Sequence, residues 1–151
     1  MTSNIDQFER DLKRLGQEKF VRQLTELYKA VVLTAFQYVT ANSLTVGVAY
    51  GSPVLTGRFY GSHTLTIGSV DTRVKPENPK GSAAPYPGIP LSQAASIVAR
   101  LKLDDIVYIA NALPYARRIE FEGWSKFKAP NGVYRVAANL VRMKYKNVTV
   151  N

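Results

Sequence analysis

From Ile5 to Val39, apolar side chains recur every three or four residues, which is the spacing of one face of an α-helix. This pattern predicts one long helix, or two helices that meet near Gly16. Charged residues surround the first half, whereas the second half is apolar nearly all round. The helix is therefore expected to begin in solvent, with Ser3 or Asp6 as its N-cap, and to end in the core.

Two later segments have the pattern of strands. Residues 63–69, HTLTIGS, alternate Leu65 and Ile67 with threonines in the manner of a half-buried strand. Residues 105–113, DIVYIANAL, are apolar and rich in β-forming side chains, and Pro114 is expected to end this second strand.

Residues 115–123, YARRIEFEG, alternate Ile119 and Phe121 with charged side chains, which is typical of an edge strand. A helix over the first part of this segment remains an open alternative. Residues 133–148 fit either a helix or a long strand.

A further helix is predicted over residues 91–101, LSQAASIVARL, which place Ser92 at the start. One face of this helix consists of Ala94, Ile97, Val98 and Leu101.

Residues 71–90 contain five of the eight prolines, so they are expected to form a loop or an arm. The sequence thus predicts a single α+β domain over residues 1–151. A long N-terminal helix would pack on a small, mainly antiparallel sheet, with one or two further helices.

Composition narrows the functional classes. The chain has 151 residues, a net charge of +9 and no cysteine, so disulfides, thiolate metal sites and cysteine nucleophiles are excluded. The uncharged run between Lys29 and Arg58 is long enough to cross a bilayer, but Gln37, Asn42 and Ser43 interrupt it. A buried helix that passes into a strand explains this run, and no membrane association is expected.

Catalytic candidates are few. His63 is the single histidine, and no nucleophile motif or nucleotide-binding glycine pattern accompanies it. Asp104 with Asp105, and Glu120 with Glu122, are the two acidic pairs that offer oxygen ligands. A solvated junction explains the first pair, and surface pairing with neighbouring arginines explains the second. No catalytic residue, cofactor or metal site is therefore assigned.

Positive charge increases toward the C-terminus. Residues 1–57, 58–101 and 102–151 carry net charges of +1, +3 and +5, and no acid follows Glu122. On a helix, Arg135, Arg142 and Lys146 would share one stripe opposite the apolar face. The candidate contacts for DNA or an acidic partner are Lys126, Lys128, Arg135, Arg142, Lys144 and Lys146. The aromatic residues Trp124, Phe127, Tyr134 and Tyr145 are candidates for base stacking, with two or more of them expected in the core.

Several short motifs, in order along the chain, resemble those of the minor tail or tail-completion proteins at the head-tail junction of tailed bacteriophages. The first motif is SPVLTGRF, the second is NALPYA, the third is an acid before a glycine, and the last is the turn APNG. The residues that carry the resemblance are Ser52, Pro53, Thr56, Gly57, Arg58, Phe59, Asn111, Pro114, Tyr115, Ala116, Glu120, Gly123, Ala129, Pro130 and Gly132.

This resemblance implies a structural virion protein without enzymatic activity. It implies a homo-oligomeric ring, commonly a hexamer, at the neck between the head-tail connector and the tail tube. Its neighbours would be connector, stopper or adaptor proteins on one side and tail-terminator or tail-tube proteins on the other, with genomic DNA passing through the lumen. The chain would be made in the cytoplasm of the bacterial host.

The resemblance also implies structural roles for the motif residues. The resemblance implies that Pro114 terminates a strand, that Gly57 and Gly132 permit tight turns, and that Thr56 caps a short helix. The segment 71–90 becomes an arm toward a neighbouring subunit or ring.

Three alternatives remain open. The first alternative is a DNA-binding accessory protein that uses the same C-terminal cations. The second is another neck component, such as a tail terminator or head-tail adaptor. A metal-dependent hydrolase that uses Glu120 and Glu122 is the third.

Overall fold

The computed structural model describes residues 4–41, 50–54, 57–76 and 88–150. Within these ranges the elements are α1 (Asn4–Thr40), α2 (Arg58–Gly61), β1 (His63–Ile67), α3 (Leu91–Ala99), β2 (Val107–Asn111), α4 (Ala116–Phe121) and α5 (Tyr134–Tyr145). This arrangement confirms the predicted α+β class. In the described part of the chain two longer helices follow α1, as predicted, and two short ones accompany them.

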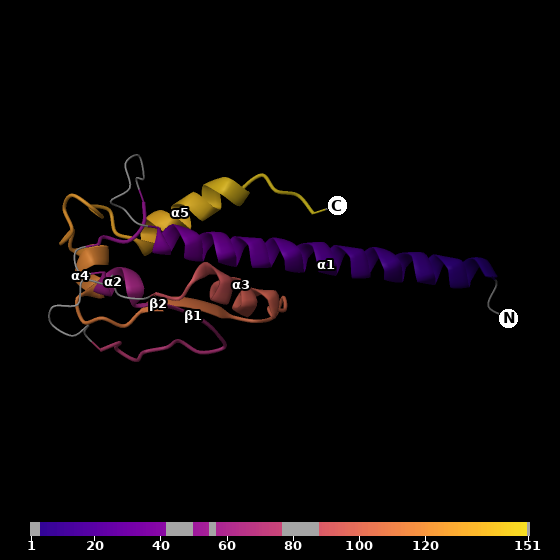
Figure 1. The fold of residues 1–151 in the computed structure, drawn as a ribbon. Coiled ribbons are helices and arrows are strands. Elements are labelled where there is room, and N and C mark those ends of the chain that lie inside the picture. The colour runs from indigo at the N-terminus through magenta and orange to yellow at the C-terminus, as the bar shows by residue number, and fades with distance from the viewer. Residues whose placement is uncertain (1–3, 42–49, 55–56, 77–87, 151) are drawn as a thin grey trace.

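Helix α1 is continuous through Gly16, so the alternative of two helices is wrong. Its first half extends away from the rest of the molecule, and the N-terminus lies at its far end (Figure 1). Its second half enters the core, where Val32, Phe36 and Val39 are buried. The prediction that the helix begins in solvent and ends in the core is therefore confirmed.

Strands β1 and β2 form a two-stranded antiparallel sheet. Their register pairs His63 with Asn111 and Leu65 with Ile109. Leu65 is buried against α1 and α3, because alternate side chains of a strand face the same side of the sheet. Both strands were predicted from their β-branched and apolar residues.

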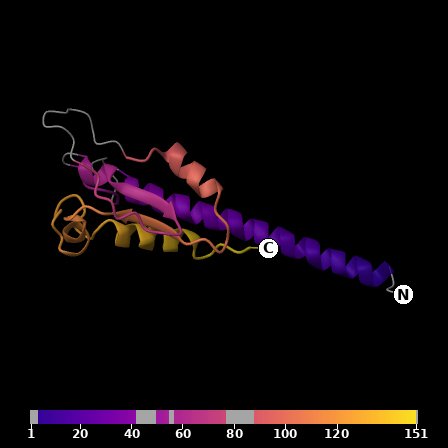
Figure 2. The ribbon, with the colours of Figure 1, turned by 90° about the horizontal axis from the view of Figure 1, so that it is seen from below.

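Helices α3 and α5 lie on different sides of α1 (Figures 1 and 2). The apolar interior forms two clusters, and α1 contributes to both. The first cluster contains Val39, Phe59, Leu113, Ile119, Ala129, Val133 and Ala137. The second contains Val32, Phe36, Leu65, Ala94, Val98 and Leu101.

The edge strand predicted over residues 115–123 is wrong, and the helix left open for the first part of this segment is confirmed as α4. The amide of Ile119 donates to the carbonyl of Tyr115, as in a helical turn. Ile119 is consequently buried whereas Phe121 is exposed. Period-two alternation over so few residues did not distinguish a strand from a short amphipathic helix.

Several predicted boundaries shift by a few residues. Helix α3 begins at Leu91 with Pro90 rather than Ser92 at its N-cap, and β2 ends at Asn111, before Pro114. Ser3, Thr56, the strand expected after α1 and much of the arm at 71–90 lie outside the described residues.

Replacing Phe36 by Ala should lower the free energy of unfolding by about 3–5 kcal/mol, because the ring is 1% exposed and its removal leaves a cavity. Replacing Phe20 by Ala is the matched control, because Phe20 is 47% exposed on the first half of the same helix. Urea unfolding of both variants measures the difference. Equal losses would contradict the placement of the two halves of α1.

Candidate functional site

A chain of buried hydrogen bonds passes through His63 and joins three parts of the fold. The hydroxyl of Ser52 donates to the carbonyl of Val39 at the end of α1, over 2.7 Å. Its Oγ lies 2.6 Å from Nε2 of His63 on β1. On the other side of the ring, Nδ1 lies 2.7 Å from the hydroxyl of Tyr134 on α5.

The proton positions follow from this geometry. Because the one hydroxyl proton of Ser52 goes to Val39, Nε2 of His63 carries a proton and donates it to Ser52 Oγ. A neutral imidazole then accepts at Nδ1 from the hydroxyl of Tyr134.

This arrangement is unsuited to nucleophilic catalysis, although a serine and a histidine lie in contact. A general base must accept the serine proton, whereas this imidazole donates to the serine. Ser52 and His63 are 0% and 1% exposed, so neither side chain is on the outer surface. Their contact joins the end of α1 to β1.

Burial keeps the side chains of His63 and Tyr134 neutral near pH 7. Burial, with a smaller contribution from the nearby charge of Lys75, lowers the pKa of His63 to about 3. Burial also raises the pKa of Tyr134 well above its usual range, with a smaller contribution from the charge of Glu120.

A cavity of about 250 Å³ lies beside His63. Its lining includes Gln37, Thr40 and Tyr60, and no charged side chain is among its described lining residues. The imidazole that faces the cavity is neutral near pH 7, because burial lowers its pKa.

Glu120 closes the N-terminus of α5. Its carboxylate accepts hydrogen bonds from the amides of Val133, Tyr134 and Arg135 over 2.7, 2.9 and 2.8 Å. These amides have no partner within the helix, and the carboxylate also complements the positive end of the helix dipole. The N-terminus of α5 is thus already occupied by an anion from the same chain.

Gly132 permits this contact. Its φ is +82°, and an added Cβ would lie 2.7 Å from the carbonyl oxygen of Glu120 and 2.9 Å from its carboxylate. The tight turn that the family resemblance implied at Gly132 is therefore present, and its close approach serves Glu120.

Neither acidic pair forms a metal site. Glu120 is engaged with backbone amides, whereas Glu122 is exposed and lies 3.9 Å from Arg118. Glu120 lies in α4 and Glu122 is its C-cap, so the predicted surface pairing with a neighbouring arginine is present at Glu122 but wrong for the buried Glu120. Among the described residues no group of three or more histidine or acidic side chains is placed to hold a metal ion.

Asp105 closes the turn between α3 and β2. Its carboxylate accepts from the amide of Lys102 over 2.8 Å, and its carbonyl accepts from the hydroxyl of Tyr28 over 2.8 Å. Asp104 beside it is exposed, as expected for a solvated junction.

The six candidate cations do not form one surface. Lys128 donates to the carbonyl of Val54 over 2.6 Å, and Arg135 donates to the carbonyl of Glu120 over 2.8 Å. Both head groups thus have structural contacts.

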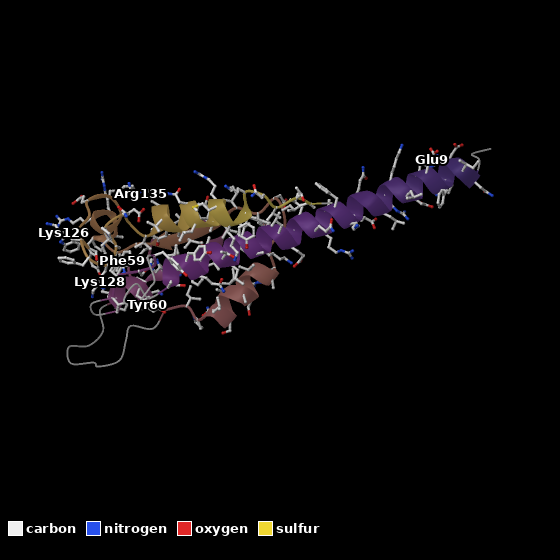
Figure 3. The ribbon with its side chains drawn as sticks, turned by 90° about the horizontal axis from the view of Figure 1, so that it is seen from above. Glu9, Phe59, Tyr60, Lys126, Lys128 and Arg135 are labelled. Atoms are coloured by element: carbon white, nitrogen blue, oxygen red, sulfur yellow. The ribbon has the colours of Figure 1, made fainter. Side chains whose placement is uncertain are left out.

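The remaining four candidates are exposed but separated. Lys126 lies at one end of the molecule (Figure 3). Arg142 and Lys144 lie in the last turn of α5, and Lys146 follows as its C-cap. Arg135, Arg142 and Lys146 do share the exposed side of α5 that the helical spacing predicted.

Three aromatic side chains are exposed around α4. Phe121, Trp124 and Phe127 are 68%, 57% and 99% exposed. The guanidinium of Arg118 lies 5.7 Å from the centre of the Trp124 ring, and that of Arg135 lies 5.9 Å from the centre of the Phe121 ring. Tyr134 and Tyr145 are half-buried instead, so two of the four predicted aromatic candidates face the interior.

The motif residues hold α2, β2 and α4 together. Asn111 donates from its amide to the carbonyl of Phe59 over 2.9 Å, and its side-chain oxygen accepts from the amide of Leu113. The ring of Tyr115 lies between those of Phe59 and Trp124, at 6.4 and 5.6 Å. These contacts explain the second motif as a structural junction.

The glycines and prolines of the motifs lie in the turns around this junction. Gly57 occupies the N-cap of α2 with a φ of 80°, and Gly123 has a φ of 62° after α4. Pro53 is buried, whereas Pro114 and Pro130 are exposed.

Sequence reasoning missed two features. The partnership of Ser52 with His63 gave no signal, because neither residue belongs to a recognisable spacing. One signal could have indicated that Glu120 caps α5. Its carboxylate precedes a glycine turn, and a predicted helix follows that turn.

Comparisons with protein-family models, with curated proteins and with solved structures found no match. The described helices include none with the length and apolarity to cross a membrane.

Acid should destabilise the protein through His63. Below its unfolded pKa of about 6.5, the unfolded chain binds a proton that the folded chain does not bind until about pH 3. The free energy of unfolding should therefore fall by about 2 kcal/mol between pH 7 and pH 5. Urea unfolding across this range measures the slope, and the His63→Gln variant should lose most of it. An imidazole that titrates near pH 6.5 in the folded protein, by NMR, would contradict its burial.

Glu120→Gln should lower the free energy of unfolding by about 1.5–3 kcal/mol, because charge-assisted hydrogen bonds to the α5 amides are weakened. Glu122→Gln is the matched control and should change it by less than about 0.5 kcal/mol. Thermal and urea unfolding provide the measurement. A divalent ion that stabilises the wild type but not Glu120→Gln would instead support the metal-dependent alternative.

Proposed function

We propose that this chain is a structural virion protein of a tailed bacteriophage. It forms a homo-oligomeric ring at the head-tail junction, joins the connector to the tail tube and lets DNA pass. The observation that carries this proposal is a helix whose first half packs on nothing else in the described chain yet exposes large apolar side chains. Large exposed apolar surfaces are rare on soluble monomers and are typical of subunits that bind other proteins.

The extent of accessible surface supports assembly. The chain exposes 10452 Å² for a mass of 16.8 kDa. A compact monomer of this mass exposes about 7,700 Å². The excess of about 2,800 Å² is several times the roughly 800 Å² that each partner buries in a standard interface.

The contacts of the potentially reactive side chains within the fold also support a structural role. His63 and Glu120, the strongest candidates for chemistry, hold α1, β1, α4 and α5 in place. The motif residues that resemble tail-completion proteins support a junction between elements as well. The proposal therefore assigns no catalytic residue and no cofactor.

The ring has neighbours and a lumen in this proposal. A hexamer would contact connector, stopper or adaptor proteins on one side and tail-terminator or tail-tube proteins on the other. Arg142, Lys144 and Lys146 would repeat around the axis and present positive charge to DNA or to an acidic neighbour. The chain would be made in the host cytoplasm and end in the virion.

Electron microscopy of particles from a phage that encodes this chain should locate it in a ring between head and tail. A nonsense mutation in its gene should leave heads and tails unjoined. The unaltered gene, supplied in trans, is the control and should restore infectious particles. Purified particles that lack the chain would contradict the proposal.

The DNA-binding alternative predicts a different result with the purified chain. It requires duplex binding that weakens steeply with salt. Arg142→Gln together with Lys146→Gln is the sharper variant, because Arg135 also holds the carbonyl of Glu120. Lost DNA affinity with normal particle assembly would favour the alternative. Lost assembly with unchanged DNA affinity would favour the neck protein.

A further inference from the structure

The protruding half of α1 carries an apolar stripe formed by Ile5, Phe8, Leu12 and Leu15. These side chains are 70%, 64%, 54% and 59% exposed. Their spacing of three, four and three residues aligns them along one side of the helix. The stripe does not continue the core-facing side, because Leu12 and Val32 are separated by about five and a half turns.

Acidic residues flank this apolar stripe. Glu9 lies on one edge, and Asp11 and Glu18 lie on the other, at the positions next to a helical seam. Arg14 lies 3.6 Å from Asp11 and 3.8 Å from Glu18, but all three side chains are exposed and such pairs are weak. Two copies of the stripe that faced each other would bring these acids together, so the stripe favours a cationic partner.

A cationic aromatic surface of this kind lies elsewhere on the same chain. We call it the tip patch, and it consists of Arg118, Phe121, Trp124, Lys126, Phe127 and Arg135. Phe127 is 99% exposed, and arginines lie over the rings of Trp124 and Phe121. Aromatic side chains and arginine are the residues most enriched at the centres of protein interfaces.

The two surfaces lie at opposite ends of the molecule. Figure 3 shows Glu9 near the free end of α1 and Lys126 at the far end of the body. One chain therefore does not bring its own apolar stripe to its own tip patch. The stripe of one copy can instead meet the tip patch of a second copy, because charge and apolar area are complementary between the two surfaces.

We propose that the apolar stripe of one copy packs on the tip patch of the next copy. The contact is heterologous, so a contacting pair keeps a free tip patch on one copy and a free stripe on the other, and repetition gives either a closed ring or an open chain. Only the closure of repeated contacts into a ring rests on the proposed function. The contact itself is a property of the purified full chain.

Single substitutions on each surface test this contact. Leu12→Asp alters the stripe and Phe127→Asp alters the tip patch, and both sites are exposed, so folding should be retained. Each variant should weaken self-association by at least about tenfold, as measured by sedimentation velocity over a concentration series. Gln17→Asp and Asn139→Asp add the same charge at exposed positions on α1 and α5 and should associate like the wild type.

Mixing the two variants gives the sharper result. Leu12→Asp keeps an intact tip patch and Phe127→Asp keeps an intact apolar stripe, so the mixture should form a one-to-one dimer that grows no further. A wild type that stays monomeric, a Phe127→Asp variant that associates normally, or a mixture that stays monomeric would each overturn the proposed contact.

The test also separates this inference from the proposed function. A chain that is monomeric when purified but present at the head-tail junction would overturn the contact alone. Head-to-tail association of a chain that is absent from particles would support the contact and contradict the neck function.

Discussion

The burial of the second half of α1 is the constraint on which the rest of the structure depends. The two apolar clusters lie along this half, with α3 and the sheet against one part and α5 against another. A two-stranded sheet has too little area to form a core alone. The long helix therefore supplies the surface that the short elements lack, and changes at Val32, Phe36 or Val39 would affect every layer.

Polar contacts then fix the elements that apolar packing has brought together. Non-directional burial does not set the rotation of α5 about its own axis, whereas two hydrogen-bonded side chains do. Tyr134 is held through its hydroxyl by His63 and through its amide by Glu120. This double restraint at the first residue of α5 explains why the sole histidine and one of the few C-terminal acids are used inside the fold.

Much of the fold could be predicted from local patterns, and the errors have physical causes. Helix α3 has a periodicity that matches its burial, and the apolar second half of α1 lies in the core as predicted. Both strands were predicted from their composition, although their burial does not alternate. A strand and a helix both remained open for the segment of α4, because it is too short for its periodicity to separate them. The position of Glu120 depends on α5, which follows it in the chain. The site was less predictable, since Ser52 and His63 meet only after α1 and β1 have packed. The exposure of the apolar stripe was also hidden, because periodicity identifies an apolar side without showing what covers it.

The continuity of α1 also limits which insertions the helix can accept during evolution. A rigid helix couples the direction of its free end to the body, so one residue inserted after Leu15 would turn the stripe by about 100° and point it away from its present direction. Seven inserted residues would restore roughly the same direction and move the stripe about 10 Å outward. The reach of the helix can therefore change without turning the stripe only through insertions close to a whole number of helical turns, such as seven or eleven residues.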